Sequence, residues 1–354
     1  MGRFLLHRLL RALLAAWAII SVIFLLSRAG AQERPPASRL AEGSLSATTA
    51  SPVQRRQAGQ LQQRRLGLTG PLFYVSAAPA PAAGLGWRWH WNGRANQYHQ
   101  WLRRLVHANL GVSFRDGQPV TLLLGQSLRY TLPLTVGAAV CSIGLVWLVA
   151  PHLGRPSWRR RFLLGLFFVV DAVPLFVVAL LLLLLLANPD ALAWFPAYGL
   201  GPEDAAAPWP VRLQALAYHL ALPLLTLTLA SLPALAVPLD AALRHELRAD
   251  YVLTARAKGL PDSLVIRHHA LRNALLPALT LLTELLPGLV AGSVVVELVY
   301  SLPGMGRLLA EAAAAHDYPV LLGGVLLIAL VRLLGQLLAD WLYTLADPRI
   351  RLPV

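Results

Sequence analysis

Charged residues are scarce in this chain of 354 residues. They make up 14% of the sequence, whereas about a quarter of an ordinary soluble domain is charged. Hydrophobic residues make up 56%, and the mean hydropathy is +0.57. This balance excludes an ordinary soluble domain and indicates a membrane protein.

Cysteine is nearly absent, because Cys141 is the only one in the chain. A single cysteine excludes an intrachain disulfide framework and a metal site built from several cysteines. Since Cys141 lies inside an apolar run, we expect its thiol to pack in the core.

The sequence also lacks a nucleotide-binding loop. A chain that hydrolyses ATP with such a loop needs a Gly-rich segment that ends in Gly-Lys-Ser/Thr. The only lysine, Lys258, is preceded by Ala257 and followed by Gly259. Any ATPase that drives this chain must therefore be a separate subunit.

Motifs for metal chemistry are missing as well. His245-Glu246 is not followed by a second histidine at the metalloprotease spacing. The adjacent His268 and His269 point to different faces of a helix. We therefore expect neither a metal nor another cofactor.

Six apolar runs reach or approach the ~20 residues that a helix needs to cross a bilayer. They predict an all-α integral membrane protein with six transmembrane helices, at residues 12–27, 131–150, 162–187, 213–237, 275–296 and 320–343. Pro223 and Pro233 are expected to break the fourth run. A cleaved signal peptide is the alternative for the first run, because Ala29-Gly30-Ala31 follows it.

The positions of the arginines predict the orientation. The formal charge of +14 is compatible with nucleic acid, anionic lipid or orientation signals as its cause. The short loop 155–161 holds four arginines, whereas the loop after the third run holds Asp190, Glu203 and Asp204 but only Arg212. Because short cytoplasmic loops are rich in Lys and Arg, both termini are predicted to be cytoplasmic, and no nucleic acid is expected.

The apolar runs divide the chain into four parts. Residues 1–28 form the cytoplasmic N-terminus and first helix, and residues 29–124 form a long periplasmic insertion. Residues 125–343 form a five-helix transmembrane core, and residues 344–354 form a cytoplasmic tail. A short outer loop is expected at residues 301–318.

A polar stretch at residues 239–274 separates the fourth and fifth runs. Asp240 to Lys258 is a run of good helix formers, and Gly259 suits the position just past a helix end, because it adopts φ > 0 without a steric cost. Pro261 and Asp262 allow a second helix to start. We expect a helix, a sharp turn and a second helix that protrude as an elbow. The alternative is an amphipathic loop that lies on anionic lipid.

Four sequence blocks carry a family resemblance. They are LGVSFRDGQPV (110–120), ARAKG (255–259), HALRNALLP (269–277) and GSVVVELVYSLPGMGRLLAEAAAAHDYPV (292–320). In these blocks the chain resembles inner-membrane permeases of binding-protein-dependent ABC importers, in the branch that carries dipeptides, oligopeptides and nickel.

The resemblance implies the type I ABC importer permease architecture, with a long periplasmic insertion after the first helix. It also implies the partners: a homologous second permease subunit, two ABC ATPase subunits and a periplasmic substrate-binding protein, besides membrane lipid. ATP-driven closure of the ATPases would push on the stretch 239–274, which we call the coupling loop, and would exchange inward-facing and outward-facing cavities.

By the same resemblance, the ATPase contacts of the coupling loop would come from Tyr251, Thr254, Ala255, Arg256, Ala257, Lys258 and Gly259. The base of the elbow would be shaped by His269, Arg272 and Asn273. The chain departs from the branch at Val237, Asp240 and Leu253, where arginine is common. Details of ion pairing are therefore not carried over from the family.

Two carboxylates within the apolar runs are candidates for the substrate pathway, because charges in a membrane usually face a bundle interior or a cavity. Glu297 stands at the family's own acidic position, where a hydrogen-bonded carboxylate that holds the outer turn is the alternative. Glu284 lies deeper, with an arginine partner as its alternative.

Two other functional classes are compatible with a membrane protein of this composition. An integral-membrane enzyme could use His90, His99 and His107, but the sequence pairs none of them with a nucleophile. A stand-alone secondary transporter would be expected to show internal repeats or broken midplane helices, and no clear repeat is visible.

Overall fold

The computed structural model describes residues 10–11, 13–22, 24–25, 70–79, 87–200 and 208–346, except for the side chains of 275–284, 286 and 338–346. The chain divides into two compact units. Unit 1 comprises Met1–Ala12, Leu122–His316 and Leu327–Val354, and unit 2 comprises Leu13–Thr121 and Asp317–Leu326. The segment 29–69 and the tail 347–354 lie outside the described residues.

Aromatic side chains form the core of unit 2. A short apolar helix, Leu13–Val22, leads to Phe24, whose ring stacks on Trp101 of helix α4 (Gln97–Val106) with centroids 4.8 Å apart. Asn96 caps α4, because its side-chain oxygen accepts a 2.7 Å hydrogen bond from His99 N. These contacts attach α4 to the end of the first apolar run.

A β-hairpin lies in the segment for which only helices were expected. Strand β1 (Val75–Pro79) pairs antiparallel with β2 (Trp87–Trp91), and Val75 lies opposite Trp91. The sequence of β2, WRWHW, places its three tryptophans on one face, and aromatic residues favour strands. The prediction of an all-α chain is therefore wrong for this segment.

The block LGVSFRDGQPV closes on itself and is held by a buried carboxylate of unit 2. Val112 and Pro119 form an isolated antiparallel bridge. Asp317, which is 3% exposed, accepts hydrogen bonds from Ser113 Oγ at 2.5 Å and from Phe114 N at 3.1 Å. The motif therefore acts as a loop fixed to the start of α13 (Tyr318–Ala346).

The second apolar run forms a longer helix than predicted. Helix α5 spans Val120–Val149 and continues into a short 3₁₀ turn, η2 (Ala150–His152). Cys141 of α5 is exposed, so the prediction that it packs in the core is wrong.

The third apolar run is not one straight helix. Helix α6 (Trp158–Ala172) and helix α7 (Leu175–Leu182) meet at an angle of 105°, and a π-helical turn, η3 (Leu183–Ala187), follows α7. Val173 at the break is extended, with φ −94° and ψ 125°. Pro174 explains the break, because a proline clashes with the helical conformation of the residue before it.

The fourth apolar run, in contrast, is continuous. Helix α8 spans Trp209–Glu246, and Pro223, Pro233 and Pro238 lie inside its 38 residues. The prediction of a break at Pro223 and Pro233 is therefore wrong. Buried side chains along α8 pack against neighbouring helices, and such packing offsets the hydrogen bonds that prolines remove.

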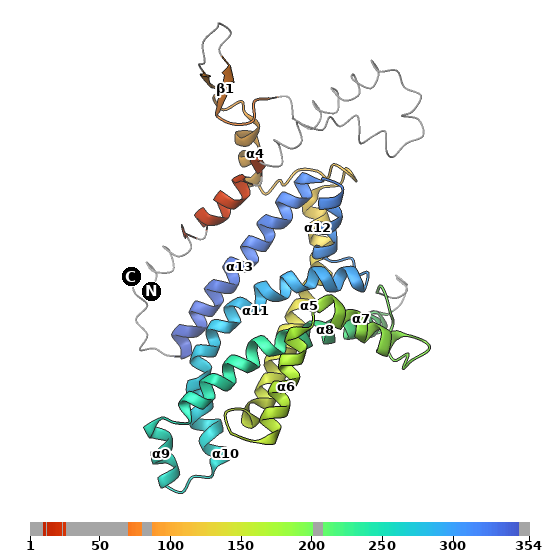
Figure 1. Cartoon of the computed structure of the whole chain (residues 1–354). Coiled ribbons are helices and arrows are strands. Elements are labelled where there is room, and N and C mark those ends of the chain that lie inside the picture. Colours follow the sequence, from red (N-terminus) through yellow and green to blue (C-terminus); the bar gives the residue numbers. More distant parts are fainter. Residues whose placement is uncertain are drawn as a thin grey trace. The chain divides into compact units, whose positions relative to one another are not determined.

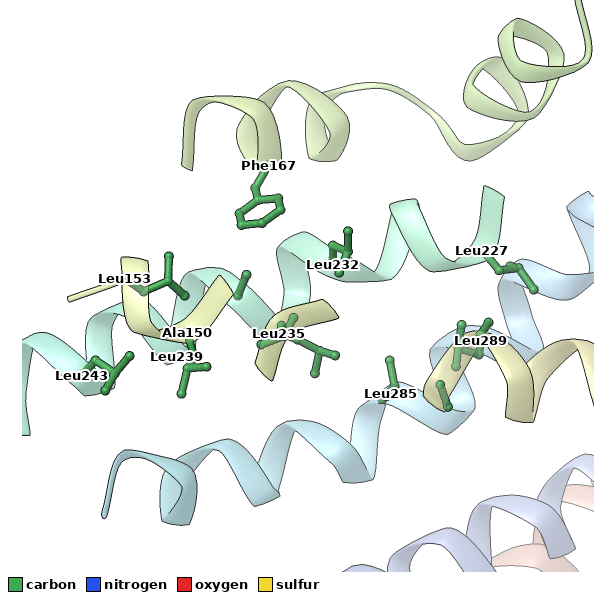
Figure 2. Close-up of a cluster of buried hydrophobic side chains, with 14 of the residues drawn as sticks. Ala150, Leu153, Phe167, Leu227, Leu232, Leu235, Leu239, Leu243, Leu285 and Leu289 are labelled. Carbon is green, nitrogen blue, oxygen red and sulfur yellow. The ribbon is translucent and has the colours of Figure 1, made fainter. Parts of the chain in front are cut away.

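Buried side chains of α8 and α11 (Leu271–Val299) form a large part of the core of unit 1. Figure 2 shows Leu235 and Leu239 of α8, Leu285 and Leu289 of α11, and Phe167 of α6 in this cluster. The predicted outer loop 301–318 contains a further helix, α12 (Met305–Ala314), that the sequence reading missed.

Three helical segments are long and apolar enough to cross a membrane: Val120–His152, Trp209–Glu246 and Tyr318–Leu337. The bent pair α6 and α7 makes a fourth if it counts as one span. This search covers the described residues only, so the predicted six-helix count stays a prediction.

Candidate coupling site

The coupling loop forms a helical elbow beyond the ends of α8 and α11 (Figure 1). The single helix expected from Asp240 to Lys258 is instead two helices, because α8 ends at Glu246 and α9 spans Asp250–Ala257. Between them, Arg248 N donates to His245 O and Ala249 N donates to Glu246 O, at 3.1 and 3.0 Å. These tighter bonds end α8 and turn the chain.

Gly259 forms the bend of the elbow. Its φ is +78°, a conformation that glycine adopts at no steric cost. Gly259 N donates to Arg256 O at 2.9 Å, and Leu260 N donates to Ala255 O at 3.4 Å. This pair of bonds is the Schellman pattern that satisfies the last carbonyls of a helix. As predicted, a new helix, α10 (Asp262–Leu264), begins directly after Pro261.

Tyr251 links three helices at the base of the elbow. Its hydroxyl donates a 2.6 Å hydrogen bond to Glu246 Oε2 at the end of α8, and the Asn273 side chain of α11 makes a second hydrogen bond with the phenol. Burial raises the pKa of the Tyr251 phenol, and the Glu246 carboxylate raises it further. The phenol therefore stays protonated at neutral pH and keeps donating to Glu246.

The two faces of α9 differ in exposure. Val252 and Ala255 are 0% and 7% exposed and pack into the core of unit 1. The outward face and the bend carry exposed residues from the predicted contact set, namely Thr254, Arg256, Ala257, Lys258 and Gly259. Ala255 therefore supports α9 from inside, whereas these five side chains and backbone groups are accessible to a partner.

The remaining residues of the predicted base lie around the start of α11. His269 belongs to a π-helical turn, η4 (Val265–Ala270), and is half-buried. Arg272 is exposed, and Asn273 is half-buried. The structure thus brings Asn273 to Tyr251, and it leaves Arg272 on the surface of the elbow.

Several ion pairs near the elbow were not found by sequence reasoning. Asp262 Oδ1 lies 3.2 Å from Arg256 Nε, and its other oxygen lies 2.9 Å from Arg155 Nη2. The buried Asp240 pairs with Arg160 and Arg244. Asp240 and Arg244 are four residues apart on α8. Arg155 and Arg160, in contrast, are about 80 to 110 positions from their partners in the coupling loop, so no local pattern signals these two pairs.

Glu297 is buried at the other end of α11. Its Oε1 accepts a 2.6 Å hydrogen bond from Thr131 Oγ1 of α5, and its Oε2 accepts from Gly306 N at 2.6 Å and Arg307 N at 3.1 Å. These two N–H groups belong to the first turn of α12, whose N-cap Gly304 has no side chain to cap it. The arrangement favours a structural role, in which Glu297 holds the outer turn.

The other candidate carboxylate, Glu284, belongs to α11, and its side chain lies outside the described residues. The histidines of the hypothetical enzyme site do not converge. His99 Nδ1 lies 2.9 Å from the Tyr74 hydroxyl, and His107 Nδ1 lies 2.8 Å from Arg103 O. Within the described ranges, no cluster of three or more His, Cys, Asp or Glu could hold a metal ion.

Comparison with known proteins covers the helices that carry this site. Residues 131–352 match the family described as "Binding-protein-dependent transport system inner membrane component". A putative peptide transport system permease protein of Brucella abortus is 36% identical over 258 residues, which cover 72% of this chain and 79% of the relative.

Two further relatives extend the comparison. The oligopeptide transport system permease protein of Bacillus subtilis is 33% identical over 261 residues, with 72% of this chain and 79% of the relative covered. A probable peptide ABC transporter permease protein of Sinorhizobium fredii is 30% identical over 355 residues, with 99% of this chain and 100% of the relative covered. The similarity to the latter therefore extends through the segment before α5.

Proposed function

This chain belongs to the family of inner membrane components of binding-protein-dependent transport systems, and we propose that it forms half of a translocation pathway for peptides. Support for the cargo comes from the relatives, which are named as peptide and oligopeptide permeases. The chain is thus a transport subunit of the inner membrane.

We propose six transmembrane helices with both termini in the cytoplasm. Three candidate spans among the described residues support this count, and we count the bent pair α6 and α7 as a fourth. The shorter apolar helix Leu13–Val22 and helix α11 would supply the remaining two. Residues 29–124 are then the periplasmic insertion, and 125–343 are the core. The arginines of the loop 155–161 keep that loop, and with it the elbow, on the cytoplasmic side.

The proposed complex contains a homologous second permease subunit, two ABC ATPase subunits and a periplasmic substrate-binding protein. A separate ATPase is required because the only lysine of the chain is not part of a Gly-Lys-Ser/Thr motif. The binding protein would deliver cargo from the periplasmic side, and membrane lipid would surround the helices.

The elbow is proposed to receive the force of ATP hydrolysis. The observation that carries this proposal is the exposed outward face of α9, which ends in the open bend at Gly259. Arg256 and Lys258 offer positive charge to an acidic or carbonyl-lined groove. Because Tyr251 hydrogen-bonds both Glu246 and Asn273, a displacement of α9 is passed to α8 and α11.

Glu284 is the proposed carboxylate of the substrate pathway. The next residue, Leu285, lines an apolar recess of about 370 Å³ between α7, α8 and α11, together with Leu227 and Gly288. A carboxylate in this part of α11 would attract the cationic amino group of a peptide. Glu297 would contribute indirectly, because its oxygens already hold the outer turn.

Gly259→Asp tests the coupling proposal. An added Cβ meets no heavy atom of the described residues within 4 Å, its two chain neighbours aside, so the variant is expected to reach the membrane. A carboxylate at the bend would be desolvated when the elbow enters the ATPase groove, and no cationic or hydrogen-bonding partner would offset this cost. We expect co-purification with the ATPases to fall at least about tenfold, which corresponds to ~1.4 kcal/mol.

Gly117→Asp is the matched control. Gly117 has a φ of +68° and also no neighbour within 4 Å, but it lies in the LGVSFRDGQPV loop. The Gly117→Asp variant therefore has a similar backbone strain and the same change of charge as Gly259→Asp. Its association with the ATPases should stay at the level of the unsubstituted protein. Normal association and peptide uptake in Gly259→Asp would contradict the coupling proposal.

A further inference from the structure

The arginines of the α5–α6 connection and the start of α6 are used in different ways. Arg160 is 18% exposed in its side chain and pairs with Asp240, and Arg155 is 36% exposed and pairs with Asp262. Arg159 and Arg161 are exposed. Two of the four arginines that determine the orientation therefore also bind carboxylates of the coupling loop.

Asp240 is the inner of these two carboxylates. Its side chain is 2% exposed, and it binds Arg160 through both oxygens, at 2.7 and 2.8 Å. Gly154 N donates to Oδ1 at 2.9 Å, and Arg244 Nε lies 3.0 Å from Oδ2. A planar guanidinium bound through two hydrogen bonds fixes both distance and orientation.

Gly154 brings the backbone of the connection against α8. Its φ is +77°, and an added Cβ would lie 3.0 Å from Leu243 Cβ and 3.0 Å from Leu247 Cδ1. A side chain at this residue would adopt a strained φ and would require Leu243 or Leu247 to shift by a few tenths of an ångström. Apolar contact and the ion pair of Asp240 act at the same place.

Asp262 is the outer carboxylate and joins the same connection to the far side of the elbow. Arg155 lies 2.9 Å from one of its oxygens, and Arg256 of α9 lies 3.2 Å from the other. The α5–α6 connection is thus bound to the coupling loop on both sides of α9. The buried Asp240 holds it near the end of α8, and the partly exposed Asp262 holds it more weakly at the start of α10.

We propose that Asp240 and Asp262 are positioning residues of a two-point clamp, which makes the α5–α6 connection and the coupling loop move as one body. A load on α9 would then reach α5 and α6 as well as α8 and α11. This inference rests on the proposed coupling function. Its physical basis is that separating Asp240 from Arg160 would break three hydrogen bonds to a buried carboxylate, two from Arg160 and one from Gly154 N, and would leave it only the half-exposed Arg244. Moving both elements together leaves these bonds intact.

The first experiment separates coupling from assembly. The complete transporter, with its ATPases and binding protein, is reconstituted in vesicles with Asp240→Asn, Arg155→Gln or both. Arg159→Gln is the matched control, because Arg159 lies in the first turn of α6 but pairs with neither carboxylate. The measurements are ATPase co-purification, ATP hydrolysis and uptake of radiolabelled peptides from a partial protein hydrolysate.

We expect the ATPases to stay bound in all variants. In the double variant, uptake per ATP hydrolysed should fall at least about fivefold, within the range of coupling between sites in proteins. Arg159→Gln should keep the parental ratio. If the two carboxylates only stabilised the fold, uptake and ATP hydrolysis would fall together. An unchanged ratio of uptake to ATP hydrolysed in the double variant would therefore contradict the clamp proposal.

The second experiment does not depend on the stability of Asp240→Asn. Cysteines replace Arg155 and Asp262 in a Cys141→Ser background, and a short, reducible reagent that bridges two thiols joins them. If the two elements move as one body, the cross-linked transporter keeps at least about half of its uptake. Loss of uptake that a reductant restores would show that the elements must separate, and the clamp would be wrong.

These outcomes distinguish the clamp from the function on which it rests. Failure of the unsubstituted chain to bind the ATPases or to take up peptides would count against the proposed function. Intact assembly and uptake, with no effect of the substitutions on the coupling ratio, would count against the clamp alone.

Discussion

Thr131 Oγ1 donates a 2.6 Å hydrogen bond to Glu297 Oε1 and accepts a 2.8 Å hydrogen bond from Met305 N. The pair joins α5, α11 and the start of α12 through one hydroxyl and one carboxylate. Because the hydroxyl already accepts the Met305 N–H, its own proton requires an acceptor, and Glu297 supplies it. Each oxygen of Glu297 thus accepts at least one hydrogen bond, Oε1 from Thr131 Oγ1 and Oε2 from the N–H groups of Gly306 and Arg307.

Glu297→Gln should destabilise this junction. One oxygen becomes an NH₂ group that must face Thr131 Oγ1 or the N–H groups of Gly306 and Arg307, so a buried donor is left without an acceptor. The expected loss is about 1–3 kcal/mol in the free energy of unfolding. Thermal unfolding of the purified protein in detergent measures it.

Glu311→Gln is the control for that loss. Glu311 pairs with Arg307 at 2.8 Å, but its side chain is 41% exposed, and exposed pairs contribute less than about 1 kcal/mol. The unfolding temperature of the Glu311→Gln variant should stay close to that of the unsubstituted protein. If both variants lost the same stability, the role assigned to Glu297 in holding the outer turn would be wrong.

Tyr251→Phe should give a difference in stability that depends on pH. The pKa of the phenol is raised in the folded protein, so its contribution is fully present below the unfolded pKa of about 10. It is lost as the pH rises through the folded pKa. At neutral pH we expect the variant to lose about 1 kcal/mol, and this difference should shrink above about pH 10.

Unfolding temperatures of parent and variant between neutral and alkaline pH measure this effect. Tyr198→Phe is the control, because Tyr198 is 60% exposed, and it should leave the unfolding temperature unchanged. A difference for Tyr251→Phe that stayed constant above the pKa range would show that its hydroxyl does not titrate in the way described.

The orientation of the elbow can be measured with single cysteines. In a Cys141→Ser background, a membrane-impermeant thiol reagent should label Ser263→Cys only when it reaches the cytoplasmic face. Ala314→Cys on α12 should be labelled from the periplasm. Both positions are exposed, so access depends on the side of the membrane. Labelling of Ser263→Cys in intact cells from outside would reverse the proposed topology.

The sequence by itself identified the membrane class, the family and the bend at Gly259. Each of these depends on local information: composition, the ARAKG block, and a glycine that ends a run of helix formers. It also located both ends of α11 and α13 within four residues, because apolar runs of that length form helices in a membrane. Helix α8, in contrast, continues nine residues past the predicted end at Val237.

Tertiary structure decided how these pieces are joined. Whether a proline breaks a helix depends on its surroundings, so Pro174 marks a 105° bend between α6 and α7 while Pro223 lies inside the continuous α8. Likewise, Asp240 and Arg160 are 80 positions apart, and only folding brings them to 2.7 Å. The periodicity of the sequence does not predict contacts between residues so distant, because only the packing of helices against one another brings them together.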